Sequence, residues 1–231
     1  MHLLDNPIWT ALSTRQTHFA QGDRWARRFP PAVTALAGFP EACDEAYQEL
    51  AELADGAPAA LFLPAAPELP EGWNQIREAS LLQMVHENGS APSPRHEWVA
   101  LTEVDVPEMV TLAELTQPGP FGVLTYQMGT YLGIREQGKL VAMAGERLRV
   151  PGYAELSAVC TYPDHVGKGY AASLMSVLME KMRGQGETPF LHVRAHNTRA
   201  IALYERLGFR KRVEFHLAVV QRQPAAIAEA R

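Results

Sequence analysis

Residues 153–183 contain the feature that most limits the fold: a strand, a glycine-containing turn and a helix directly after it. An apolar strand is expected at 153–161. Gly167 and Gly169 then break the pattern before a helix expected at 168–183, where apolar residues recur at helical spacing until Gly184 ends it. Such a unit needs a sheet with at least one helix packed on its face.

The other expected elements follow the same reasoning along the chain. Helices are predicted at 41–54, 106–115 and 198–207. Strands are predicted at 61–63, 73–86, 98–101, 130–136, 139–150, 189–195 and 213–220. Tight turns at 137–138 and 151–152 join consecutive strands in the second half. This order predicts an α/β (α+β) fold, with a mixed, mostly antiparallel sheet flanked by helices in the C-terminal half.

A Gly-, Ser- and Pro-rich segment at 87–94 divides the 231-residue chain. We expect an N-terminal α/β region at 1–90 and a second domain at 97–231. The first region contains no chemical motif, and we expect it to pack on the second domain.

The composition and net charge limit the classes of partner that the chain is expected to bind. A formal net charge of −5 argues against nucleic acid or an anionic membrane as the partner. The two cysteines, Cys43 and Cys160, form no metal motif or disulfide framework. The first residues do not resemble a signal peptide, and no apolar run is long enough to span a membrane. The expected location is the cytoplasm.

The turn at 162–169 has the chemistry of a diphosphate site. Its glycines leave backbone N–H groups unobstructed, the helix start adds further donors, and Lys168 adds a positive charge. A P-loop is excluded because Gly169 follows Lys168 where Ser or Thr is required. A dinucleotide site is a weaker alternative, since residues 163–166 separate the turn from its strand. A glycine-rich turn without a ligand is the third possibility.

Two segments together resemble a known family. Val166-x-x-Gly169-x-Ala171 is similar to motif A of the GNAT superfamily of N-acetyltransferases, and residues 197–209 (NTRAIALYERLGF) are similar to its motif B. The resemblance covers about residues 97–220, and the run 157–209 most resembles the glycine N-acyltransferase-like branch. Val166 departs from the Arg or Gln usual at the first position of motif A.

The resemblance implies a GNAT fold, acetyl-CoA as cosubstrate and no metal. It assigns the cofactor's diphosphate to the amides of Val166, Gly167, Lys168, Gly169, Tyr170 and Ala171. It assigns the pantetheine arm to the strand backbone at Val159, Cys160 and Thr161. Asn197 is expected to cap the next helix and to contact the cofactor. Tyr204 is expected to lie near the thioester sulfur and to protonate the leaving thiolate.

An amine must lose a proton before it attacks a thioester, and Glu155 is the candidate base. Glu146 competes with it, and water is a third possibility. If residues 151–152 form a two-residue hairpin, both glutamates share one face of the sheet.

Other reactive residues have weaker interpretations. His192 and His196 lack a third ligand for zinc, and His165 is expected to be an exposed loop residue. Cys160 lacks a base to activate it as a nucleophile. The sequence therefore predicts an N-acetyltransferase acting on a small-molecule or peptide amine, with a CoA-binding module without turnover as the alternative. It does not identify the acceptor, the acyl chain length or the oligomeric state, and a homodimer is one of the states left open.

Overall fold

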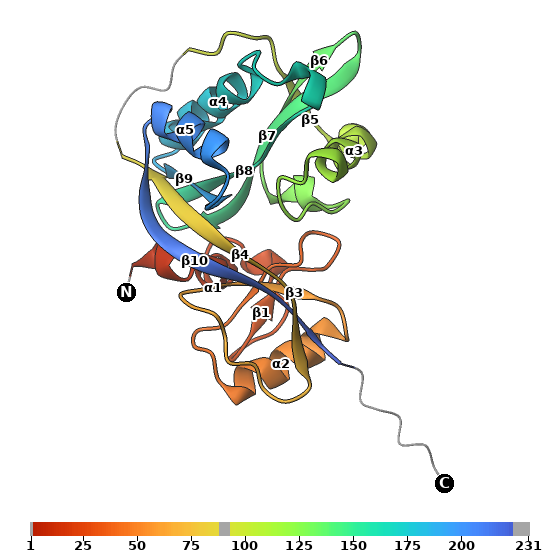
Figure 1. The fold of residues 1–231 in the computed structure, drawn as a ribbon, viewed down its shortest axis with the longest axis vertical. Helices are drawn as coiled ribbons and strands as arrows, with labels where there is room; N and C mark the ends of the chain where they lie inside the picture. The colour runs from red at the N-terminus through yellow and green to blue at the C-terminus, as the bar shows by residue number, and fades with distance from the viewer. Residues whose placement is uncertain (1, 88–92, 224–231) are drawn as a thin grey trace.

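The computed structural model describes residues 2–87 and 93–223, so residues 88–92 of the predicted linker lie outside the described chain. Its main feature is an eight-stranded sheet in the order β3-β10-β4-β9-β8-β7-β6-β5 (Figure 1). In the described residues β8 and β9 run parallel, and the other neighbouring strands are antiparallel. The predicted fold class is confirmed.

The bounds of the elements agree closely with the expected ranges. The main strands are β3 (Ala59–Leu63), β4 (Trp73–His86), β5 (Val99–Leu101), β6 (Tyr131–Glu136), β7 (Lys139–Val150), β8 (Tyr153–Thr161), β9 (Thr188–Arg194) and β10 (Phe209–Arg222). The α-helices are α1 (Pro7–Ser13), α2 (Asp44–Ala54), α3 (Val106–Thr116), α4 (Tyr170–Gly184) and α5 (Thr198–Arg206). Among these helices none has the length and apolar composition needed to cross a membrane.

Helices cover both faces of the sheet (Figure 1). On one face α4 buries Leu174, Leu178 and Met182 against β7, β8 and β9, and α5 packs beside it. On the other face α3 packs on β7 and β8, and α1 packs on β7. The apolar spacing predicted for α4 is therefore the side that it buries.

The N-terminal region contributes strands to this same sheet. β10 pairs with both β3 and β4, and β4 lies between β10 and β9. A ladder of backbone hydrogen bonds thus crosses the expected division between 1–90 and 97–231. Residues 1–90 and 97–231 thus share one sheet, and their division into two domains remains a prediction.

Several local details differ from expectation. Short or polar segments were not predicted: α1, and the two-residue strands β1 (Arg27–Arg28) and β2 (Ala37–Gly38). β10 begins at Phe209, before the expected 213. Asp105, the residue before α3, makes no capping bond to that helix, because its carboxylate instead accepts from the amide of Thr102 at the preceding 3₁₀ turn.

Candidate active site

The loop before α4 presents unpaired amides. A 3₁₀ turn at Pro163–His165 ends β8, and α4 begins at Tyr170 with Gly169 as N-cap. In the described residues no acceptor is bonded to the amides from Gly167 to Ala172. The Val166 amide, predicted to face the ligand, donates to the Pro163 carbonyl at 3.2 Å. The prediction for that amide is therefore wrong, because the turn uses it.

The two predicted glycines are needed for their backbone conformation. Gly167 has φ +96° and Gly169 has φ +85°, a region that L side chains rarely adopt. A Cβ at Gly167 would meet no atom within 4 Å, so steric room is not the reason for glycine there. This conformation turns successive amides toward one side, as an anion site requires.

Lys168 belongs to a charged cluster beside the loop. Its Nζ lies 3.1 Å from Glu136 Oε1 and 3.1 Å from His165 Nδ1. The Tyr170 hydroxyl also donates to Glu136. The hydrogen bond from Lys168 holds the pKa of the Glu136 carboxyl below its ordinary value. The positive charge expected at Lys168 is thus already paired with the Glu136 carboxylate at the surface.

Residues 95–96, which follow the linker, lie against the start of α4. The amides of Arg95 and His96 donate to Ser173 Oγ at 3.1 and 3.3 Å. His96 Nε2 lies 2.9 Å from the Lys168 carbonyl oxygen, and its ring packs edge-on against Tyr170. These contacts fix the carbonyl side of the loop and leave the unpaired N–H groups unused.

β8 and β9 diverge next to this loop. Their parallel ladder runs from Tyr153–Thr188 to Leu156–Leu191, and no pair follows in the described residues. A bulge interrupts the β7–β8 pairing in the same place, where Ala158 has φ +50°. The two strands therefore splay apart here, which leaves one edge of β8 without a backbone partner in the described residues.

The bulge also reverses which face the side chains of β8 meet. Leu156 packs in the cluster under α4, whereas Cys160, also even-numbered, packs in the cluster under α3. Val159 packs against the α4 cluster, and Thr161 is half-buried. Burial raises the pKa of the Cys160 thiol to about 11, which keeps it a neutral core residue at physiological pH.

Helix α5 places both predicted motif B residues. The Asn197 side chain accepts from the Ala200 amide at 3.1 Å, so its predicted role as N-cap is confirmed. Tyr204 is buried in the α4 cluster and packs edge-on against Phe209. Burial raises its pKa to about 12, with a smaller contribution from Cys160 on β8. A neutral phenol thus lies near the splayed part of β8, close enough to Cys160 for the two groups to interact electrostatically.

Glu155 lies in a closed ion-pair network. Arg147 binds it with two N–H groups, at 2.9 and 2.6 Å, and His192 Nδ1 lies 2.6 Å from Oε1. The side chain is 0% exposed. Burial alone would raise the pKa of Glu155, but Arg147 and then His192 lower it to about 2. Such a weak and enclosed base does not favour direct proton removal from a substrate by Glu155.

Glu146 is paired as well, on the opposite face. It accepts from Arg149 at 2.7 Å, from Lys181 of α4 at 3.1 Å and from the Thr130 amide at 3.0 Å. These bonds outweigh burial and lower the pKa of its carboxyl. The expected shared face is wrong, because a bulge sets Arg147 and Leu148 against Glu155 and moves Glu146 opposite Leu156.

The Glu155 network predicts an acid-dependent stability. Because its pKa falls from the ordinary 4.5 to about 2 on folding, the stabilisation is present above pH 4.5 and is lost as the pH falls toward 2. We expect the loss of unfolding free energy in Glu155→Gln, measured with urea, to be constant from pH 7 to about pH 5 and to shrink below. A difference between the two proteins that stays constant to pH 3 would contradict this assignment.

The other reactive side chains of the described chain do not gather into a metal site. In residues 2–87 and 93–223 no three His, Cys, Asp or Glu side chains come together as metal ligands.

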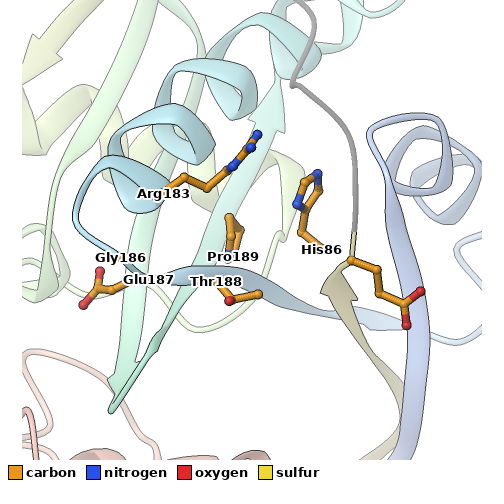
Figure 2. Close-up of a pocket in the computed structure, with 7 residues that line it drawn as sticks. His86, Arg183, Gly186, Glu187, Thr188 and Pro189 are labelled. Carbon is orange, nitrogen blue, oxygen red and sulfur yellow. The ribbon is translucent and has the colours of Figure 1, made fainter.

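A cavity of about 320 Å³ is lined by His86, Glu87, Arg183, Gly186, Glu187, Thr188 and Pro189. Figure 2 shows His86 of β4 and Arg183 of α4 extending over Pro189. This cavity lies at the C-terminal end of α4 and the start of β9, away from the loop with unpaired amides.

Sequence reasoning missed Arg147, Tyr131 and the pairing of His192 with Glu155. Arg147 and Tyr131 are buried, and the His192 side chain is 1% exposed, on strands rich in apolar neighbours. One signal was available: a charged residue inside the long apolar strand 139–150 needs a buried partner of opposite charge. The sequence did not identify the partner, since that depends on the bulge.

Comparison with known proteins gives consistent results. The family model described as FR47-like protein matches residues 131–217. The [ribosomal protein bS18]-alanine N-acetyltransferase of Escherichia coli K12 is 31% identical over 116 residues, 48% of this chain and 78% of that protein. A solved GNAT-family structure from Novosphingobium aromaticivorans is 40% identical, with a TM-score of 0.88 over 97% of this chain and 100% of that one. A GCN5-related N-acetyltransferase from Kribbella flavida, at 16% identity, has a TM-score of 0.62 over 97% and 98% and shows the fold alone.

Proposed function

The chain belongs to the GNAT family of acetyltransferases, and on that premise we propose that it transfers an acetyl group from acetyl-CoA to a primary amine. One observation carries the proposal: the amides from Gly167 to Ala172 have no acceptor in the described protein, and they adjoin the splay between β8 and β9. Unpaired donors at the start of a 15-residue helix suit a diphosphate. The open edge of β8 suits the amides of a pantetheine arm.

Each part of the cofactor then has residues to hold it. The amides from Gly167 to Ala172 bind the diphosphate, and the backbone of Val159, Cys160 and Thr161 pairs with the pantetheine arm. Asn197 stays a cap for α5 and borders the same strand opening. The departure at Val166 costs little under this proposal, because backbone N–H groups provide the binding. The motif similarity supports a position near the glycine N-acyltransferase-like branch.

The reaction needs one bond made and one broken. The amine nitrogen forms a bond to the acetyl carbon, and the bond from that carbon to sulfur breaks. The acceptor first loses its ammonium proton to water and attacks as the free amine. Tyr204 donates its phenolic proton to the departing sulfur, and the proton that nitrogen loses as the amide forms returns to Tyr204 through water. Glu155 and Glu146 hold ion pairs in this scheme. Positioning the two substrates together supplies much of the rate enhancement.

The acceptor is proposed by class. A small-molecule amine or the amine of a peptide fits direct transfer, and the name of the Escherichia coli relative specifies an alanine of a ribosomal protein. A panel of amino acids, alkyl amines and short peptides, with thiol release from acetyl-CoA as the readout, tests the proposal. Acetyl-CoA binding by calorimetry together with amine-dependent thiol release supports it. Binding of NAD in place of acetyl-CoA, or binding without release for every amine, refutes it.

The glycine at the N-cap of α4 gives a direct test of the cofactor loop. In Gly169→Val a β-branched side chain must adopt φ +85°, at a cost of at least 1–2 kcal/mol, so the loop is expected to move its amides. We expect the Kd for acetyl-CoA to rise about tenfold or more, measured by calorimetry.

Gly152→Val is the matched control for that variant. Gly152 has φ +79° in the β7–β8 turn and no neighbour within 4 Å of an added Cβ, and at Gly169 such a Cβ would meet only His96 Nε2, at an ordinary contact distance of 3.7 Å. Gly152→Val carries the same conformational cost away from the loop. Equal weakening of acetyl-CoA binding in both variants would show that the loop amides are not the binding site.

A further inference from the structure

Tyr131 has a buried hydroxyl without a partner. The residue lies at the start of β6, is 2% exposed, and its Oη has no hydrogen-bond partner in the described protein. Buried polar groups in folded proteins are nearly always hydrogen-bonded, so an unpaired buried hydroxyl calls for an explanation. The reaction scheme above does not use it.

The backbone shows where this hydroxyl points. Tyr131 pairs with Gly145 of β7, and Gly145 pairs with Ser157 of β8, so the three form one row across the sheet. A Cβ added at Gly145 would lie 2.2 Å from Tyr131 Cε1 and 2.6 Å from Cζ. The ring therefore lies across β7 where only glycine leaves room for it, and its hydroxyl end points toward β8.

The electrostatic neighbours agree with that direction. Burial raises the pKa of Tyr131, the positive charge of Arg147 lowers it, and Glu155, Glu146 and Cys160 raise it, so these groups lie near the ring. Glu155 and Cys160 flank Ser157 and the bulged Ala158 on β8. The hydroxyl is thus neutral and faces the row where the β8–β9 ladder has just ended.

Tyr131 and Tyr204 lie on opposite faces of the sheet. Tyr131 packs with Met143 and Cys160 in the cluster under α3, and Phe121 meets its ring edge-on. Tyr204 packs in the cluster under α4. In direct transfer the amine attacks one face of the thioester carbonyl and the sulfur then departs from the tetrahedral carbon, so the nitrogen and the sulfur are contacted by two different protein groups.

We infer, on the basis of the proposed function, that the Tyr131 hydroxyl binds the acceptor amine, accepting one N–H hydrogen bond and directing the nitrogen lone pair toward the splay. The half-buried Ser157 marks the way in from that face. Apolar neighbours around the ring fit an amine on a slender apolar stem, such as a lysine-like or alkyl amine.

Tyr131→Phe removes the hydroxyl and keeps the ring. With the best acceptor from the amine panel, we expect kcat/KM for the amine to fall about 3- to 10-fold, mainly through a higher KM, as for the loss of one hydrogen bond between neutral groups. The Kd for acetyl-CoA should stay unchanged by calorimetry. The urea midpoint should stay equal or rise, because no protein partner is lost. Tyr126→Phe is the matched control, since Tyr126 packs on the same cluster.

The outcomes separate this inference from the proposed function. Unchanged kcat/KM in Tyr131→Phe with an active wild type overturns the inference alone. A wild type that binds no acetyl-CoA or transfers to no amine overturns both. Gly145→Ala gives a second test, because its Cβ displaces the Tyr131 ring; it should reproduce the loss of amine affinity, and retained affinity in that variant also overturns the inference.

Discussion

Tyr204→Phe should reduce kcat at least about 100-fold while leaving the Kd for acetyl-CoA within about twofold. The reason is that a positioned general acid contributes about 10²- to 10⁴-fold, and the phenylalanine retains the ring that packs against Phe209. Thiol release under saturating acceptor measures kcat, and calorimetry measures binding.

Tyr153→Phe is the control for this change. Tyr153 lies at the start of β8, where the ladder to β9 is intact, and its hydroxyl lies 3.2 Å from the His2 ring. It should keep wild-type turnover. If Tyr204→Phe had the same kcat as the wild type, its hydroxyl would have no part in the mechanism, and water would deliver the proton.

The second large effect concerns stability. Arg147→Met leaves Glu155 charged, 0% exposed and without its bidentate partner, and we expect the free energy of unfolding to fall by about 3–5 kcal/mol. Urea denaturation at pH 7 measures it. Adding Glu155→Met to Arg147→Met should recover part of the loss, because the unpaired buried charge is removed.

A surface ion pair supplies the comparison. Arg135 contacts Asp105 and Glu108 and is 26% exposed, and exposed pairs contribute about 0–1 kcal/mol. Arg135→Met should therefore cost much less than Arg147→Met. Equal losses in the two variants would mean that burial does not set the strength of the Arg147–Glu155 pair.

The sequence predicted most elements because their signals are local. Alternation and helical spacing over ten or more residues locate β7, β8 and α4 within a few positions. The two bulges were not predictable, because each depends on how two strands meet. At Ala158 and at Arg147–Leu148 a one-residue slip decides which face every later side chain occupies.

The same distinction divides the candidate site. The unpaired amides near Gly167 and Gly169 follow from a short motif, so they were predictable. The role of Glu155 depends on long-range contacts with Arg147 and His192, and a polar residue on a strand gives no sign of such partners. Tyr131 was missed because its direction depends on a glycine in the neighbouring strand.

The pairing of β10 with both β3 and β4 has a consequence for synthesis. The ribosome releases β10 last among the strands, yet the first two long strands of the chain both depend on it for their hydrogen bonds. Until residue 222 emerges, β3 lacks its sheet neighbour and β4 has an open edge, and such exposed edges are prone to wrong pairing. The nascent chain therefore acquires this complete sheet only after residue 222 has left the ribosome.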